Sequence, residues 1–157
     1  MSQPGSEADL GILLTLALRA FTDQLHAALE QAGFGDLRPA FGVVFRALRD
    51  EPLTLTVLAA RLGVTKQAAA KVTGEMEGKR LLRKKGSSVD GRAKLLELTA
   101  RGRRAMATAI QIGAQIDQRL VETVGQRTAQ GMRRALEQLV VDSGLGDDLA
   151  RRRSPAV

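Results

Sequence analysis

Two polar side chains that can recognise nucleic-acid bases stand four residues apart in the segment TKQAAAKVTGEMEGK. They are Gln67 and Lys71, and this spacing places them on one face of a helix. A glutamine can form two hydrogen bonds with adenine, and a lysine can donate to the acceptor atoms of guanine. The same face carries Ala70, Gly74 and Gly78, which would let the helix lie deep in a groove. Two glycines and an alanine are poor choices for a helix face that meets only water, so the pattern favours a docked face over a solvated one.

Basic residues that could contact a polyanion follow in the segment LLRKKGSSVDGRAKLLELT. Lys84 lies between Arg83 and Lys85, and Glu97 lies between two leucines. Alternation on both sides of a Ser/Gly/Asp turn predicts two short strands joined as a hairpin. An arginine near a hairpin tip can enter a narrow minor groove, where the negative potential of DNA is strongest. The basic residues expected at the edge of this hairpin are Lys84, Lys85, Arg92 and Lys94.

A pair of short helices must position the first of these groups. Thr54 can cap a helix that runs to Leu62, and Gly63 can take the left-handed conformation that ends it. Thr65 can then cap the helix that carries Gln67. Two short helices separated by a glycine turn indicate a helix-turn-helix. A basic hairpin directly after such a pair corresponds to a wing.

Long helices are predicted on both sides of this segment. Apolar residues recur at helical spacing from Leu10 to Leu29 and again after Thr99, with a break near Gly125. Pro39 can begin another helix that continues to about Leu48. The first and last helices offer more apolar surface than a winged helix can cover, so they either bury each other within one chain or interlock across a two-fold axis.

Charge and composition narrow the class of protein. The 157 residues carry a net charge of +7, and residues 54–104 hold 13 Lys and Arg against 4 Asp and Glu, whereas the rest of the chain holds 11 and 13. Positive charge gathered in one segment indicates a polyanionic partner, and the competing interpretation is a solvated basic face. No apolar run approaches the roughly 20 residues that span a bilayer, and no secretory signal is visible, so we expect a cytoplasmic protein.

Enzyme chemistry finds little support. The chain has no cysteine, and His26 is its one histidine, so a catalytic triad or a histidine–cysteine metal site lacks its members. Glu75 and Glu77 lie two apart on a helix and point in different directions. We therefore expect no enzyme activity, no cofactor and no metal.

Residues 53–102 resemble the MarR family of bacterial transcription regulators. The matching pieces are LTLTVLAARLGVT, the helix start Thr65-Lys66-Gln67, Asp90 and Arg92 in the hairpin, and LTARG from Leu98 to Gly102. Their order and spacing carry the likeness more than any single piece. One departure is Arg80, where the family usually has glycine, and another is the absence of tyrosine and tryptophan, which often line effector pockets in this family.

The resemblance implies a mainly α fold, a winged helix-turn-helix with N- and C-terminal dimerisation helices and a small β-hairpin wing. It implies one domain over residues 1–157, with a DNA-binding lobe at 38–98, a helical dimerisation lobe at 6–33 and 99–145, and a mobile tail at 146–157. The expected dimer interface comprises Leu10, Leu13, Leu14, Ala17, Met132, Leu136, Leu139 and Val140. The expected DNA-binding residues are Thr65, Lys66, Gln67, Ala70, Lys71, Lys84, Lys85, Asp90, Arg92 and Lys94, with Arg92 in the minor groove and Asp90 orienting it.

The expected function is a homodimeric regulator that binds double-stranded DNA at an inverted repeat, acts as a repressor and is released by a small-molecule effector, without a membrane partner. A second hypothesis is an architectural or protein-binding module that has the fold but does not read DNA sequence. The feature that favours it is the scarcity of long side chains on the outer helix face, where Ala68–Ala70 and Gly74 stand.

Overall fold

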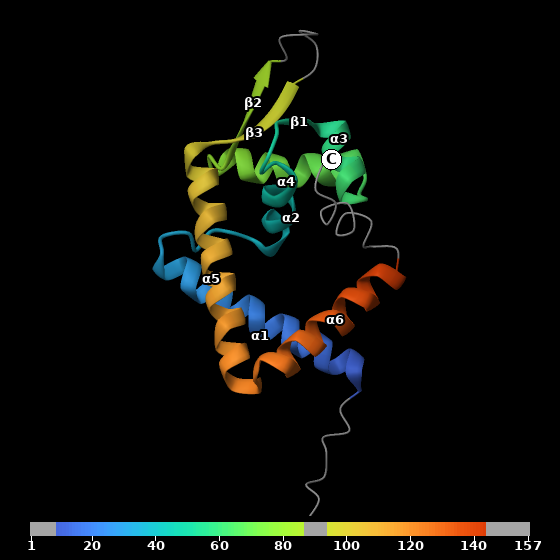
Figure 1. Ribbon diagram of the computed structural model, residues 1–157. Coiled ribbons are helices and arrows are strands. Elements are labelled where there is room, and N and C mark those ends of the chain that lie inside the picture. Colours follow the sequence, from blue (N-terminus) through green and yellow to red (C-terminus); the bar gives the residue numbers. More distant parts are fainter. Residues whose placement is uncertain (1–8, 87–93, 144–157) are drawn as a thin grey trace, which may run out of the picture. The chain divides into compact units, whose positions relative to one another are not determined.

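Six helices and three strands make up the part of the chain that the computed structural model describes, residues 9–86 and 94–143 (Figure 1). Contacts divide it into two units, residues up to Ile116 and from Asp117 onward, with the boundary inside the fifth helix. No helix in the described ranges is long and apolar enough to cross a membrane. The elements in chain order are α1 (Leu10–Gln31), α2 (Pro39–Ala47), β1 (Leu53–Thr54), α3 (Leu55–Leu62), α4 (Lys66–Gly78), β2 (Leu82–Gly86), β3 (Lys94–Leu98), α5 (Ala100–Val124) and α6 (Gln126–Asp142).

The helix-turn-helix forms where the sequence predicts it. The hydroxyl of Thr54 accepts a hydrogen bond from the Val57 amide at 3.3 Å and caps α3. Gly63 ends that helix with φ 64°, and the hydroxyl of Thr65 accepts from the Ala68 amide at 3.1 Å to start α4. Each cap satisfies an amide that has no partner within the helix. The expected mainly helical winged-helix fold is confirmed.

A third strand joins the expected hairpin. The sheet order is β1-β3-β2 with antiparallel pairing, and Leu53 and Thr54 of β1 lie opposite Leu96 and Leu95 of β3 (Figure 1). The sequence analysis missed β1, because a strand of two residues shows no alternation. The extra strand ties the start of α3 to the base of the hairpin.

The core of the first unit lies between the helices and the buried face of the sheet. Leu82, Leu96 and Leu98 alternate with exposed or half-buried residues, so each strand buries one face. Burial of these apolar side chains supplies the main driving force for folding. The largest fully buried side chains are Phe41, Val44, Leu58, Met76, Leu81, Leu82 and Leu96.

The turn from α4 into β2 has an unusual backbone that the start of α5 supports. Arg80 adopts φ 57°, the left-handed conformation that glycine takes most easily. The hydroxyl of Thr99 donates to the Arg80 carbonyl at 2.6 Å and accepts from the Gly102 amide at 3.0 Å. A Cβ atom on Gly102 would lie 1.9 Å from the Leu81 carbonyl oxygen, so only glycine fits there. Two residues of the LTARG segment, Thr99 and Gly102, thus hold the turn against the start of α5.

The second unit comprises the end of α5 and all of α6. Gly125 has φ 80° and separates the two helices, so the predicted break near this residue is confirmed. Ala129 is buried, and the Arg133 guanidinium contacts the Asp117 carboxylate at 3.0 Å. An ion pair between Arg133 and Asp117 thus links α6 to the end of α5. The predicted division into lobes stays a prediction, and the expected tail at 146–157 lies outside the described residues.

Candidate nucleic-acid interface

The outer face of α4 presents the predicted base-reading residues together. Lys66, Gln67, Ala70 and Lys71 are all exposed, and Thr65, which caps the helix, is exposed beside them. The opposite face is buried through Ala69, Thr73 and Met76. A helix that buries one face and exposes the other offers its polar side chains in a fixed direction.

One residue of the inner face was not expected. Thr73 is 2% exposed and was not identified from the sequence, because a threonine has no clear place in an apolar pattern. Its hydroxyl donates to the Ala69 carbonyl at 2.9 Å, which satisfies the buried oxygen within the helix itself. Thr73 therefore fills space in the core without needing a partner from another element.

The glycines of α4 leave its outer face open. A Cβ atom placed on Gly74 or Gly78 would meet no atom within 4 Å outside the helix's own backbone. Packing within the chain therefore does not require glycine at either position, although glycine lowers helix stability. Close approach of another molecule is one physical reason to keep this face flat.

Ion pairs from the loop before α2 hold the second half of α4. The carboxylate of Asp36 lies 3.5 Å from the Lys79 ammonium and 3.6 Å from the Arg101 guanidinium of α5. The Arg38 guanidinium pairs with Glu75 on the same helix. These pairs link the loop before α2 to α4 and to α5, although each surface pair contributes little to stability. Sequence reasoning missed them, because no local pattern links residues so far apart.

The described lysines of the hairpin lie on two opposite faces. The Lys84 ammonium contacts the Glu77 carboxylate of α4 at 2.6 Å, on the side of the sheet that faces the core. Lys85 is the next residue, so it points to the other side and is exposed. Lys94 is exposed on the same face as Lys84, opposite Gly86. The expected cluster at the edge of the hairpin stays a prediction. Asp90 and Arg92 lie outside the described residues.

The face of the hairpin that points away from α4 carries an ion pair between one arginine and one carboxylate. Arg83 and Glu97 are cross-strand partners, and their side chains form an ion pair at 2.5 Å. The hydrogen bond from Arg83, helped by the charges of Arg83, Lys85 and Arg103, lowers the pKa of Glu97 below its usual value. Arg83 thus pairs with the one carboxylate of the hairpin stem, and Lys85 and Arg103 add positive charge near it.

Apolar side chains are exposed on α1 and α6. Leu18 is 68% exposed, and other apolar side chains along the first half of α1 are exposed too, namely Leu10, Ile12, Leu13 and Leu16. On α6, Leu139 is 53% exposed, and Met132 and Leu136 are also exposed. Of the residues predicted for a dimer interface, Ala17 is exposed, whereas Leu14 and Val140 are half-buried. A monomer rarely leaves so much apolar surface in contact with water.

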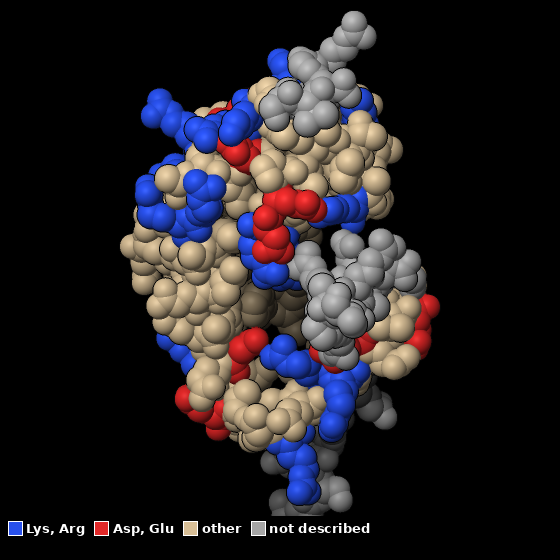
Figure 2. Space-filling model, turned by 45° about the horizontal axis from the view of Figure 1, so that its top comes forward, with Lys and Arg blue, Asp and Glu red and all other residues tan. Residues whose placement is uncertain are grey.

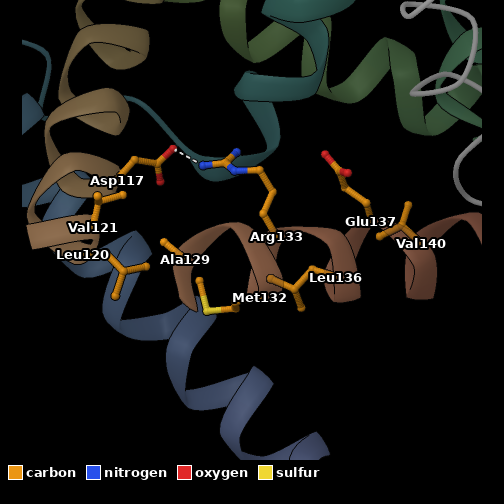
Figure 3. Close-up of a pocket in the computed structure, with 9 residues that line it drawn as sticks. All are labelled: Asp117, Leu120, Val121, Ala129, Met132, Arg133, Leu136, Glu137 and Val140. Atoms are coloured by element: carbon orange, nitrogen blue, oxygen red, sulfur yellow. Dashed lines mark hydrogen bonds and ion pairs between the residues drawn. The ribbon is translucent and has the colours of Figure 1, made fainter. Parts of the chain in front are cut away.

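A groove in the second unit adds to this apolar surface. Its volume is about 340 Å³. Leu120 and Val121 of α5 line it from one side and Met132 and Leu136 of α6 from the other, with the Arg133–Asp117 ion pair at its margin (Figure 3). No group of three or more acidic or histidine side chains in the described ranges could hold a metal ion. The groove is therefore suited to apolar side chains rather than to a metal.

A capped helix pair, a short sheet with a basic hairpin and flanking long helices together define a winged helix-turn-helix protein. A sequence profile described as the MarR family matches residues 40–93. The transcriptional regulator HosA of Escherichia coli O157:H7 is 32% identical over 123 residues, which cover 74% of this chain and 89% of HosA. HosA of Escherichia coli O127:H6 (strain E2348/69 / EPEC) is 32% identical over 108 residues, 68% of this chain and 78% of that protein. The chain belongs to the MarR family of transcriptional regulators, which are not enzymes.

Solved structures agree on the fold. The transcriptional repressor CouR bound to a 23-mer DNA duplex has a TM-score of 0.70 at 23% identity, and the match covers 89% of this chain and 98% of CouR. The Mycobacterium tuberculosis MarR family protein Rv2887 in complex with salicylic acid has a TM-score of 0.60 at 29% identity, covering 85% and 98%. The likeness to CouR shows the fold alone, because the identity is below a quarter.

Proposed function

We propose that the protein is a homodimeric transcriptional repressor that binds an inverted-repeat operator and is released by a small-molecule effector. The observation that carries the proposal is the outer face of α4. Gln67 and Lys71 are exposed there, and the other residues of that face are small. Such a face fits a major groove, and its two long polar side chains can reach base edges. In this proposal α4 reads sequence, and the hairpin places Arg92 in the adjacent minor groove.

The other proposed DNA contacts hold the protein on the duplex. Lys66 and the Thr65 hydroxyl stand at the start of α4, where the helix N-terminus favours a phosphate. Lys85 and Lys94 lie near the outer ends of their strands and are exposed. Lys84 contributes less than the other lysines, because its ammonium is already paired with Glu77. These contacts position the protein and carry no sequence information directly.

The dimer follows from the exposed apolar side chains of α1 and α6. A second copy related by a two-fold axis would cover Leu10, Leu13 and Leu16 of each α1, and would place apolar side chains in the groove lined by Met132 and Leu136. A single α4 spans too few base pairs to specify one site in a genome. Two copies would enter successive major grooves, with half-sites about 10 base pairs apart.

Release by an effector is supported by the relative that was solved in complex with salicylic acid at 29% identity. A small aromatic acid is therefore the class of ligand to test first. The absence of cysteine excludes release through thiol oxidation in this chain.

A titration separates this proposal from the architectural alternative. The protein first selects a duplex from a random-sequence library, and fluorescence anisotropy then compares this duplex with a scrambled one of equal length and composition. A repressor of this kind should bind the selected duplex at least about a thousandfold more tightly. Equal affinity for both duplexes would favour a module that binds without reading sequence.

A further inference from the structure

Most of the positive charge of the DNA-binding region does not lie on α4. Residues 66–78 contain two Lys and two acidic residues, so the recognition helix carries no net charge. Residues 79–86 and 94–104, by contrast, contain nine Lys and Arg against one Glu. These two segments form the turn after α4, the hairpin stem and the first turn of α5 (Figure 1). Contacts made by α4 therefore use little of this charge.

The centre of this charge is a small cluster on one side of the hairpin. Arg83 and Lys85 alternate with the core-facing residues of β2, and Glu97 lies opposite Arg83 on the same face. Arg103 of α5 lies next to it, since its guanidinium donates to the carbonyl of Leu98, the residue after Glu97, at 2.7 Å. We call Arg83, Lys85 and Arg103 the stem patch, with Glu97 as its one carboxylate. Figure 2 shows Lys and Arg side chains gathered on the side of the molecule that carries the start of α5.

The stem patch includes the start of α5, where arginines gather at a helix end that favours anions. The first five residues of α5 include Arg101, Arg103 and Arg104 and no acidic residue. That helix end carries a partial positive charge and favours anions, so arginines there are unfavourable.

The position of the stem patch on the hairpin indicates which part of a bound duplex it would contact. Lys84 points toward α4 and pairs with Glu77, so the opposite face, with Arg83 and Lys85, points away from the helix that would read the half-site. Arg83 is three residues, about 10 Å, from the end of β2 at Gly86. A duplex contacted by the outer end of the hairpin would therefore pass close to the patch as it continues beyond the half-site.

We propose that the stem patch is a second DNA contact, which binds the phosphates of the duplex flanking each half-site. This proposal rests on the proposed function, because it needs the hairpin to approach DNA. Arginine suits the role, since its guanidinium forms paired hydrogen bonds with phosphate oxygens. The contact is independent of base sequence and adds to affinity and to salt dependence.

The test compares two duplexes that share one selected inverted repeat. The short duplex ends at the repeat, and the long duplex extends it by about ten base pairs, one helical turn, on each side. The wild-type dimer should bind the long duplex about fivefold or more tightly at low salt. The plot of log affinity against log salt should be steeper for the long duplex by about two units, because each subunit neutralises at least one further phosphate. Scrambling the flanks should leave the gain unchanged.

Variants assign the gain to the patch. The double variant Arg83→Gln with Arg103→Gln should lose the gain and keep the affinity of the wild type for the short duplex. The conservative pair Arg83→Lys with Arg103→Lys should keep most of it. Glu97→Gln removes the one carboxylate and should increase the gain, a result that a partly unfolded protein could not give. As a matched control, Lys71→Gln should weaken binding to both duplexes by the same factor.

The outcomes are distinguishable. If the wild type binds the short duplex specifically but gains nothing from the flanks, the second contact does not exist, although the proposed function stands. A gain that survives in the double glutamine variant, or that falls in Glu97→Gln, also overturns it. Failure to discriminate the short duplex from a scrambled one removes the proposed function itself.

Discussion

The hydroxyl of Thr99 donates to the carbonyl of Arg80 at 2.6 Å, and Arg80 has a left-handed backbone with φ 57°. The turn between α4 and β2 is thus held by the residue that also caps α5 through the Gly102 amide. Arg80 stands where the family usually has glycine, and the structure shows that the backbone nevertheless takes the glycine conformation. The hydrogen bond offsets part of the strain.

Arg80→Gly should therefore stabilise the protein. Glycine removes the strain of the left-handed conformation, which stabilises the folded state. Its greater freedom in the unfolded chain opposes this effect but is smaller, so the free energy of unfolding should rise by about 0.5–1 kcal/mol. Urea denaturation of the wild type and the variant measures the difference. Arg80→Ala is the control, because it removes the side chain and keeps the strain. Equal stabilisation by alanine and glycine would show that the side chain, not the backbone, is the cause.

Gly102→Ala should be strongly destabilising. The new Cβ would lie 1.9 Å from the Leu81 carbonyl oxygen, and that atom belongs to backbone that also contacts Thr99. We expect a loss of about 3 kcal/mol, at the upper end of the usual range for overpacking. Gly42→Ala in α2 is the matched control, because nothing lies within 4 Å of its added Cβ, and alanine should stabilise that helix. A Gly102→Ala protein that melts at the wild-type temperature would contradict the close approach of α5 to the turn.

Gly74→Gln should separate stability from DNA binding. The site is open and helical, so a better helix former should raise the free energy of unfolding by roughly 0.5 kcal/mol or more. The longer side chain should hinder the approach of α4 to the major groove and weaken binding to the selected duplex at least about tenfold, a cost within the range expected for overpacking an interface. Gly42→Gln should give the stability gain without the loss of affinity. An unchanged affinity for Gly74→Gln would mean that the outer face of α4 does not dock.

The apolar side chains of α1 and α6 should govern assembly. Light scattering of the wild type without DNA should give twice the chain mass of 16.8 kDa, about 34 kDa. Leu13→Asp and Leu139→Asp should each shift the protein toward monomer, because a carboxylate would be buried in the interface. Val43→Asp places the same charge on an equally exposed apolar residue of α2 and should leave the dimer intact. A wild-type monomer at micromolar concentration would remove the basis for the two-fold operator.

Much of the fold could be predicted from local patterns. Threonine caps, the glycine turn at Gly63 and helical spacing from Leu10 onward each depend on a few neighbouring residues, and the structure confirms them. The strand β1 was missed, because two residues carry no periodicity and pair only once β3 is in place. The conformation of Arg80 was missed for a related reason, since Thr99, which supports it, is 19 residues away.

The candidate site shows the same division. Exposure of Gln67 and Lys71 follows from the helix period, so the exposed face of α4 could be predicted. Pairing of Lys84 with Glu77, and of Asp36 with Lys79 and Arg101, depends on how separate elements pack, and sequence spacing does not encode it. A count of charges therefore overestimates what Lys84 can contribute to DNA binding, and it does not reveal that Arg83 pairs with Glu97.

The specificity ratio, the affinity for the selected duplex divided by that for a scrambled one, tests most directly that α4 reads sequence. Gln67→Ala and Lys71→Ala should each reduce this ratio by the equivalent of about 1–3 kcal/mol. Lys85→Ala, which changes an exposed lysine of the hairpin, should weaken binding to both duplexes alike and leave the ratio near its wild-type value. Anisotropy titrations at one fixed salt concentration give all of these ratios. If Gln67→Ala and Lys71→Ala both keep the wild-type ratio while the protein stays folded, α4 is not the reading helix.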